Sequence, residues 1–303
     1  MTELGTSTAV ASDPPKAGGR VIVAVETDEH DSGPIAWAER YARFHELPLV
    51  VAHTYTMPPP PPRLATEAGV WTDHRAFESS ASRISATVVE KLRAHGVDAS
   101  AATICDDSGR GVVSIAHADD VIVAGTAGGG AIRHFLRGGT VHTLLRHAPC
   151  PVVVVPTDWH STLADGRGHI VVGFDGTDRS RAALRWAAKE AARFGTTLEA
   201  VHAVMADPEG VDLRRDAGVA SAEAAREGVE VDVTSVVSTT DGLARSLVTV
   251  ARGAELLVLG NHRAGWFAAL AAYSVPEGAV LEPLCPVAVI PFDPPAADEA
   301  DPA

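Results

Sequence analysis

A glycine-rich segment with a hydroxyl near its end is the first feature of this sequence that could do chemistry. Glycines let backbone N–H groups approach a phosphate with no Cβ in the way, and a helix starting just beyond would add its positive end. Because glycine after a strand is also common in ordinary α/β turns, the segment alone does not decide between a phosphate loop and a turn. The residues concerned are Gly125, Thr126 and Gly128, then, after nine intervening residues, Gly138, Gly139 and Thr140.

Two carboxylates stand directly after short apolar runs. Glu26, followed by Thr27, ends the run 21–25, and Asp175 ends the run 170–174. His53 and His202 close two further apolar runs, where each suits a structural hydrogen bond or the rim of a ligand cleft. The acidic stretch 26–31 could hold Mg²⁺ beside a phosphate, although a solvated loop is the simpler interpretation.

Signatures of catalysis and of metal binding are missing from the sequence. It contains no G-x-x-x-x-G-K-[S/T], G-x-S-x-G or H-E-x-x-H motif. Its histidines, including His134, His142 and His147, lack zinc-ligand spacing, so surface or packing roles are expected. Cys150 and Cys285 each precede an apolar run and are expected to be buried. We therefore expect no catalytic residue and no metal site of the protein's own.

The chain repeats itself. Glu26 and Asp175 lie 149 positions apart, and each is followed by an amphipathic stretch containing a Trp and then by an apolar run ending in histidine. Later landmarks, Gly125 with Gly260 and Cys150 with Cys285, lie 135 positions apart. The first copy is therefore longer by 14 residues, most of which we assign to a proline-rich surface loop within 57–73.

The elements that must position these residues alternate between strands and helices. Short β-branched runs without polar alternation predict strands buried on both faces of a parallel sheet, and residues 77–92 and 183–191 carry apolar side chains at helical spacing. We predict an α/β protein of two tandem, open, doubly wound domains, each a five-stranded parallel sheet with four helices. The predicted boundaries are a disordered tail 1–18, a first domain 19–157, a linker 158–168, a second domain 169–293 and a tail 294–303.

Composition excludes several classes of partner. A formal net charge of −14 opposes the counterion release that drives binding to nucleic acid and gives no attraction to anionic membranes. No apolar run approaches the roughly 20 residues needed to cross a bilayer, and residues 1–20 do not read as a signal peptide. Three cysteines without a C-x-x-C pair favour a reducing, cytoplasmic location.

The order of motifs resembles the universal stress protein family. In both halves a strand is followed by a glycine position, an apolar helix and a proline-flanked cysteine before the last strand, seen best in Arg146-His147-Ala148-Pro149-Cys150-Pro151. The resemblance implies a fold like that of the adenine nucleotide alpha hydrolases, and ATP or another adenine nucleotide as ligand in some members, with or without Mg²⁺. Carried over, the implied binding residues are Glu26, Thr27, Thr54, Gly125, Thr126, Gly128, Gly138, Gly139 and Thr140 in the first copy, and Asp175, Ala203, Gly260 and Ser274 in the second.

Each copy departs from that family pattern in a different place. The first copy has Glu26 where Asp is expected and Gly139 where Ser or Thr is expected, although Thr140 could substitute. The second copy keeps Asp175 and Ser274, but Arg263 and Tyr273 occupy two glycine positions where a side chain would crowd a phosphate. We therefore expect the nucleotide in the first copy.

The resulting hypothesis is that the protein is an ATP-binding regulator of stress or dormancy and not an enzyme. We expect its nucleotide-bound surface to be recognised by an unknown regulatory protein or by a second protomer in a homodimer. Two rivals remain open: a nucleotide-free dimerising scaffold with decayed sites, and a weak ATP hydrolase. By analogy with the family, the last strands, 152–155 and 287–290, are expected to pair across a two-fold axis, within one chain or between two.

Overall fold

The computed structural model describes eight stretches of the chain, and everything said below concerns these residues. They are 19–26, 31–57, 74–126, 139–160, 168–205, 213–238, 242–262 and 275–292. The predicted tails, most of the proline-rich segment and most of the linker lie outside them.

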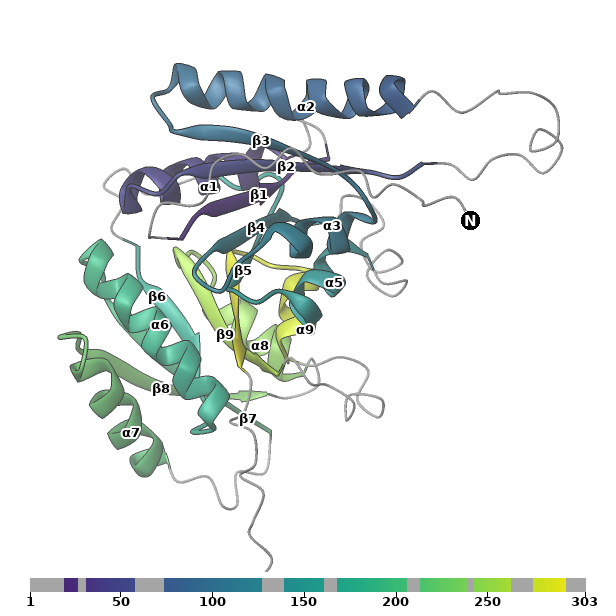
Figure 1. The fold of residues 1–303 in the computed structure, drawn as a ribbon. Coiled ribbons are helices and arrows are strands. Elements are labelled where there is room, and N and C mark those ends of the chain that lie inside the picture. Colours follow the sequence, from purple (N-terminus) through teal and green to yellow (C-terminus); the bar gives the residue numbers. More distant parts are fainter. Residues whose placement is uncertain are drawn as a thin grey trace, which may run out of the picture.

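The described residues of the first half alternate strands and helices in the predicted order (Figure 1). The apolar runs become strands because β-branched residues fit a sheet that is covered on both faces. The elements are β1 (Val21–Ala24), α1 (Ser32–His45), β2 (Leu49–Tyr55), α2 (His74–Ala94), β3 (Ala99–Cys105), α3 (Ser108–Ile115), β4 (Val121–Gly125), α5 (Thr140–His147) and β5 (Val152–Val155).

The described residues of the second half follow the same alternation. Helix α6 starts at a Thr177 N-cap, whose hydroxyl accepts from Ser180 N, and ends at Gly195 in the left-handed region, two features typical of helix ends. The elements are β6 (Ile170–Gly173), α6 (Asp178–Phe194), β7 (Leu198–Met205), α7 (Leu213–Ala225), β8 (Val231–Ser238), α8 (Leu243–Val250), β9 (Leu256–His262), α9 (Val275–Leu281) and β10 (Val287–Phe292).

All ten of these strands form one sheet in the order β3-β2-β1-β4-β5-β10-β9-β6-β7-β8. Within each half every described pairing is parallel, so the predicted doubly wound, five-stranded arrangement is confirmed. The halves meet where β5 and β10 pair antiparallel, with Val153 opposite Ala288. The expected pairing of the last strands thus occurs inside one chain.

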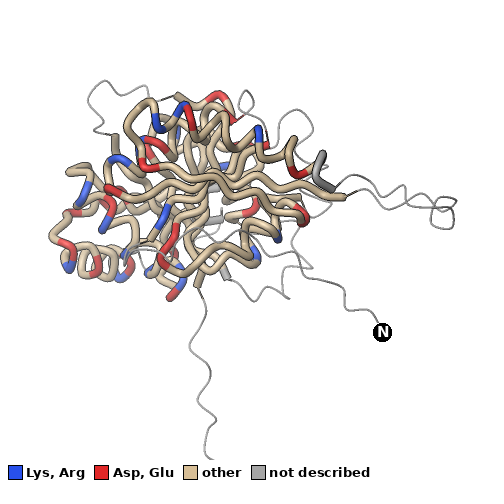
Figure 2. The backbone as a smooth tube through the Cα atoms, turned by 45° about the horizontal axis from the view of Figure 1, so that its top comes forward, with Lys and Arg blue, Asp and Glu red and all other residues tan. Residues whose placement is uncertain are grey.

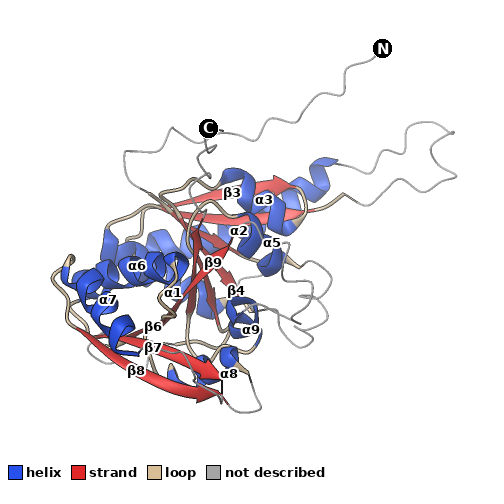
Figure 3. Ribbon diagram, turned by 90° about the horizontal axis from the view of Figure 1, so that it is seen from below, coloured by secondary structure: helices blue, strands red, loops and turns tan. Residues whose placement is uncertain are grey.

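The helices cover both faces of the sheet, and each face carries one core that runs through both halves. The core under α1, α2, α6 and α7 includes Val23, Trp37, Val153 and Ala288. The core on the opposite face includes Leu144, Val154 and Val287. Figure 3 shows α6 and α7 on one side of β6–β8 and α8 on the other. In Figure 2 the central strands are tan, and residues of both charge signs lie on the surrounding helices and loops.

Helices α1 and α6 flank the seam between the halves and hold a buried polar contact. His45 Nε2 lies 2.9 Å from Glu190 Oε2, and both side chains are 4% exposed. Tyr41 also hydrogen-bonds Glu190, and burial together with that carboxylate raises the pKa of Tyr41 above its usual value. The rings of Tyr41 and Phe194 pack against His45, and Arg40 forms an ion pair with Glu255 nearby. The seam is therefore apolar with a polar centre.

Removing Glu190 should weaken the seam sharply. Glu190→Ala leaves His45 and the Tyr41 hydroxyl buried without the carboxylate that they contact, which we expect to lower the free energy of unfolding by about 3 kcal/mol. The matched control is Glu282→Ala, whose partner Arg245 and own side chain are 64% and 69% exposed; its loss should stay below about 0.5 kcal/mol. Urea titrations followed by circular dichroism measure both, and equal losses would contradict the structural importance of the buried contact.

Candidate functional site: two crevices at the strand ends

The topology creates one crevice in each half, at the carboxyl ends of the strands where the chain order reverses. In the first half this switch lies between β1 and β4, which pair only from Val21 to Val23. Strand β1 pairs with β2 as far as Ala52, whereas β2 continues to Tyr55. The switch between β6 and β9 repeats this geometry in the second half. Ligands of such sheets bind in these crevices.

Asp31, the last residue of the acidic stretch 26–31, is buried in the first crevice and is not part of a solvated loop. Asp31 is 8% exposed, and its Oδ2 accepts a hydrogen bond of 2.6 Å from the backbone N of Glu26. Asp31 is the N-cap residue of α1 but makes no side-chain cap to that helix. Glu26, which the sequence predicted to contact the ligand, is exposed and lies two residues after the end of β1. Two acidic groups therefore border this crevice.

Gly125 and Thr126 lead from β4 into the predicted phosphate loop. A Cβ on Gly125 would lie 3.1 Å from Asp31 Oδ1 and 3.1 Å from Pro34 Cγ, so the glycine is closely packed against the carboxylate. The Thr126 amide donates to the Val155 carbonyl, 3.1 Å away, and so continues the pairing of β4 with β5. The start of the loop is thus fixed by the sheet.

Gly139 and Thr140 form the start of α5, as predicted. Gly139 is the N-cap residue of this helix. The Thr140 hydroxyl lies 2.6 Å from that of Ser108, and a Cβ on Gly109 would lie 2.4 Å from the Thr143 Cβ. Helices α3 and α5 therefore pack tightly at their N-termini, and Thr140 has a hydrogen-bonding partner there.

His53 has a structural role, one of the two interpretations left open by the sequence. Its Nδ1 donates to the Val25 carbonyl at 2.8 Å, which ties β2 to the end of β1. Thr54 is half-buried, and its methyl group packs where a Cβ on Gly111 would lie, at 2.8 Å. The backbone of Thr54 lies beyond the last residue of β2 that pairs with β1, at the mouth of the crevice.

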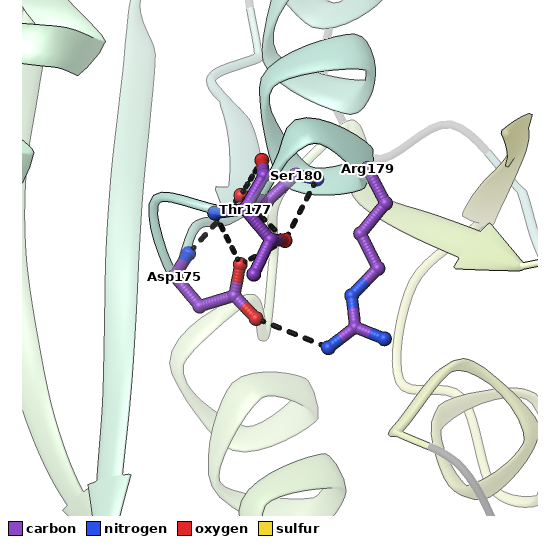
Figure 4. A network of polar contacts seen from close by, with 4 residues as sticks. All are labelled: Asp175, Thr177, Arg179 and Ser180. Carbon is purple, nitrogen blue, oxygen red and sulfur yellow. Dashed lines mark hydrogen bonds and ion pairs between the residues drawn. The ribbon is translucent and has the colours of Figure 1, made fainter. Parts of the chain in front are cut away.

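Asp175 organises the start of α6 in the second crevice (Figure 4). Its Oδ1 accepts from the amide of Thr177 at 3.1 Å and from the Thr177 hydroxyl at 2.5 Å, and its Oδ2 lies 3.4 Å from Arg179. Burial alone would raise the pKa of Asp175, but hydrogen bonds from Thr177 and Ser180 and the Arg179 charge lower it below its usual value. Asp175 thus stays ionised and committed to its own loop.

The other predicted residues of the second crevice are placed around this loop. Ala203 lies in β7, next to His202, whose Nδ1 is 3.0 Å from Asp216 Oδ2 of α7. A Cβ on Gly260 would lie 2.4 Å from the Arg179 carbonyl, so β9 touches the backbone at the start of α6. Gly176 has φ +75° and also faces Asp216. Asp216 was missed because it lies outside the motifs, whereas Asp31 was included only as a member of the acidic stretch 26–31.

Four predicted site residues lie outside the described part of the chain: Thr27, Gly128, Gly138 and Ser274. The same holds for Arg263 and Tyr273. The predicted roles of the segments that follow β4 and β9 therefore stay predictions.

Metal and thiol chemistry find no support among the described residues. They contain no group of three metal-ligating side chains. Cys150 and Cys285 are buried, and burial raises the pKa of Cys285 to about 12, so its thiol stays protonated. No helix within the described ranges is long and apolar enough to span a membrane.

A second polar contact joins the helices that follow the two predicted loops. His142 Nδ1 of α5 lies 3.6 Å from Glu277 Oε1 of α9, and these residues occupy equivalent positions in the two halves. Burial and the nearby Arg146 lower the pKa of His142, while Glu277 opposes that shift. The seam therefore carries a polar contact between helices on each face of the sheet.

A pocket is also present at the seam itself, away from both crevices. Its walls are largely apolar and are formed by Trp37, Arg40, Tyr41, Ile170, Phe194, Glu255 and Leu256. It lacks the convergent polar groups of a nucleotide site, so we assign it to imperfect packing between the halves.

Gly260→Ala should disrupt the second crevice more than Gly125→Ala disrupts the first. The new methyl group would meet the fixed backbone of Arg179 at 2.4 Å, whereas at Gly125 it meets side-chain atoms at 3.1 Å that can yield. We expect Gly260→Ala to lower the free energy of unfolding by about 1–3 kcal/mol, and Gly125→Ala by less. Urea titration of the two variants measures this, and the reverse order would refute the close approach of β9 to α6.

Comparison with known proteins agrees with the repeat and the fold. The model of the "Universal stress protein family" matches residues 19–156 and again 166–291. Universal stress protein Rv2005c of Mycobacterium tuberculosis is 29% identical over 297 residues, which cover 92% of this chain and 98% of that protein. Universal stress protein Rv2623 of the same organism is 25% identical over 275 residues, covering 85% and 91%. The crystal structure of a universal stress protein from Archaeoglobus fulgidus superposes with a TM-score of 0.68 at 17% identity, covering 89% of this chain and 96% of that one. The chain therefore belongs to the universal stress protein family, as a tandem, two-domain member.

Proposed function

We propose that the protein binds an adenine nucleotide such as ATP in its first crevice and acts as a nucleotide-responsive regulator of stress or dormancy. The observation that carries this proposal is the position of Gly125, Thr126, Gly139 and Thr140. The first two leave β4 at the switch point, and the last two open α5. The backbone amides that open α5 suit the phosphates, and Thr54 at the mouth of the crevice suits the base.

A second candidate is a scaffold without nucleotide. The tight packing of Gly125 against Asp31, and the engagement of Thr140 with Ser108, favour it, because both groups already have protein partners. Under this proposal the shared sheet is the functional feature and the crevices are vestigial. A cytoplasmic location, a homodimer and a regulatory protein partner stay predictions under either candidate.

Nucleotide retained by the purified protein would decide between them. We expect denaturation of the protein to release an adenine nucleotide identifiable by chromatography, and equilibrium dialysis to show ATP binding below millimolar concentration. Gly128→Asp should abolish binding in the first half by placing a carboxylate in the predicted loop.

The control for that substitution is Gly218→Asp, the same change at an exposed glycine of α7 with no atom within 4 Å of its Cβ position. It should leave binding unchanged. If neither released nor dialysed nucleotide is found, the scaffold is correct; if Gly128→Asp binds like the wild type, the ligand is not in the first half.

A further inference from the structure

The sheet has two outer strands, and the first half protects its own. These strands are β3 and β8, and within the described ranges no strand pairs with the outer side of either. In the first half Leu49 N donates to the Asp98 carbonyl, so the next carbonyl, that of Ala99, points away from β2. Arg93 Nε of α2 donates to this outward carbonyl at 2.8 Å. A guanidinium group therefore caps the edge of β3.

The second half lacks this cap. Strand β8 pairs with β7 in the register in which β3 pairs with β2, at an offset of 132 residues. The turns before these strands share that offset, with Gly96 and Gly228 both at positive φ. The offset places Ala225 of α7 where α2 has Arg93, and a methyl group donates no hydrogen bond. The device that protects β3 is therefore missing from β8.

The edge of β8 is also better suited to pairing than that of β3. Valine or threonine fills most of positions 231–237, and neither proline nor lysine interrupts them. Strand β3 instead holds alanine, a residue depleted in strands, at three of its seven positions. Val237 is 54% exposed, more than any other large apolar side chain that the structure describes. Figure 3 shows β8 at the margin of the sheet, outside β7. An uncapped apolar edge of this kind is a template for another strand.

The geometry of this edge fits a second copy of itself. By equivalence with Ala99, every second residue from Val231 turns its N–H and C=O to the free side, which includes Val233, Ser235 and Val237. In an antiparallel pair the hydrogen-bonded positions also recur at every second residue. Two β8 strands related by a two-fold axis at Ser235 therefore bring outward groups against outward groups. The same register places Val233 of each copy opposite Val237 of the other, where both gain apolar contact.

Charge favours the antiparallel arrangement. The acidic residues Glu230 and Asp232 lie at the start of β8, and its later residues as far as Val237 carry no charge. Antiparallel pairing places the acidic end of one copy beside the uncharged end of the other. Parallel pairing would bring Asp232 of one copy close to Asp232 of the next, which is unfavourable.

We propose that β8 is a homodimer interface, in which two copies pair β8 with β8 antiparallel about Ser235 and so join their two sheets. Strands β5 and β10, expected to pair across a two-fold axis, already pair within the chain and leave β8 available. One strand pairing buries less area than a standard interface, so the dimer is weak, with a dissociation constant of about 10–100 µM. The inference goes beyond nucleotide binding and does not depend on it.

Removing the central N–H tests the interface. Ser235→Pro deletes the amide that the two copies exchange and keeps the bonds to β7, which use the alternate residues; proline is tolerated on an edge strand when its nitrogen faces outward. Sedimentation equilibrium of the full chain, up to about 1 mM, should show a wild-type dimer and at least about tenfold weaker association of the variant. The matched control, Ala101→Pro, alters an outward, exposed position of β3 and should leave association unchanged. Circular dichroism confirms that each variant is folded.

A cysteine on the proposed axis gives an independent measurement. Ser235→Cys, combined with Cys105→Ser to remove the exposed native thiol, should form a disulfide-linked dimer on mild oxidation. Residues in a hydrogen-bonded antiparallel pair lie about 5.5 Å apart at Cα, a distance that a disulfide spans. The control is Asp232→Cys in the same background, because the two thiols would then be about 20 Å apart. Non-reducing gels compare the two variants.

The outcomes decide for or against β8. A wild-type chain that stays monomeric up to about 1 mM overturns the proposal. So does a dimer that Ser235→Pro leaves intact and that cross-links no better through residue 235 than through residue 232, because such a dimer uses another surface. If Ser235→Pro fails to fold, the cross-linking comparison decides alone. All samples are free of added nucleotide, so the result stands whether or not the proposed nucleotide binding is correct.

Discussion

The antiparallel contact between β5 and β10 is the constraint on which the rest of the structure depends. A five-stranded parallel sheet ends in a strand whose outer N–H and C=O groups need partners, and both of these strands are apolar and fully buried at Val153 and Ala288. Pairing them with each other satisfies both edges in one step. It also turns one half end over end relative to the other, so the carboxyl ends of the two parallel sets, and hence the crevices, point in opposite directions.

The seam also discriminates between correct and incorrect partners. On one face His45 meets Glu190, and on the other His142 meets Glu277; each time the histidine comes from the first half and the carboxylate from the second. His142 and Glu277 are equivalent positions of the repeat, so a seam between two second halves would bring Glu277 against Glu277. Such like-charge contacts oppose the pairing of two second halves and favour the pairing of a first half with a second half.

The repeat and the apolar runs were sufficient to predict the fold, because strands buried on both faces leave an unambiguous pattern in the sequence. The same pattern correctly predicted that Cys150 and Cys285 are buried. The candidate site was predicted only where motifs exist, at Asp175, Gly260, Gly125 and Gly139. The burial of Asp31 was not predicted, because a charged residue in an acidic loop carries no local sign of burial. Asp216 was missed because its contact, with His202, joins α7 to β7. The 149-residue offset between the two copies was the signal that could have indicated the burial of Asp31, because it aligns Asp31 with Ser180.

The pattern of divergence between the halves has a physical reason. The central strands are constrained on both faces by the continuous cores, so the two copies keep similar apolar residues there. At the strand ends the packing constraint is weaker. The fold needs only a hydrogen-bond acceptor for the backbone N–H of Glu26 after β1 and of Asp175 after β6. A carboxylate supplies it in the first half and a hydroxyl in the second. An exchange of carboxylate for hydroxyl at that position therefore keeps the hydrogen bond to the backbone. The two copies have therefore diverged at the strand ends while they share one sheet and two continuous cores.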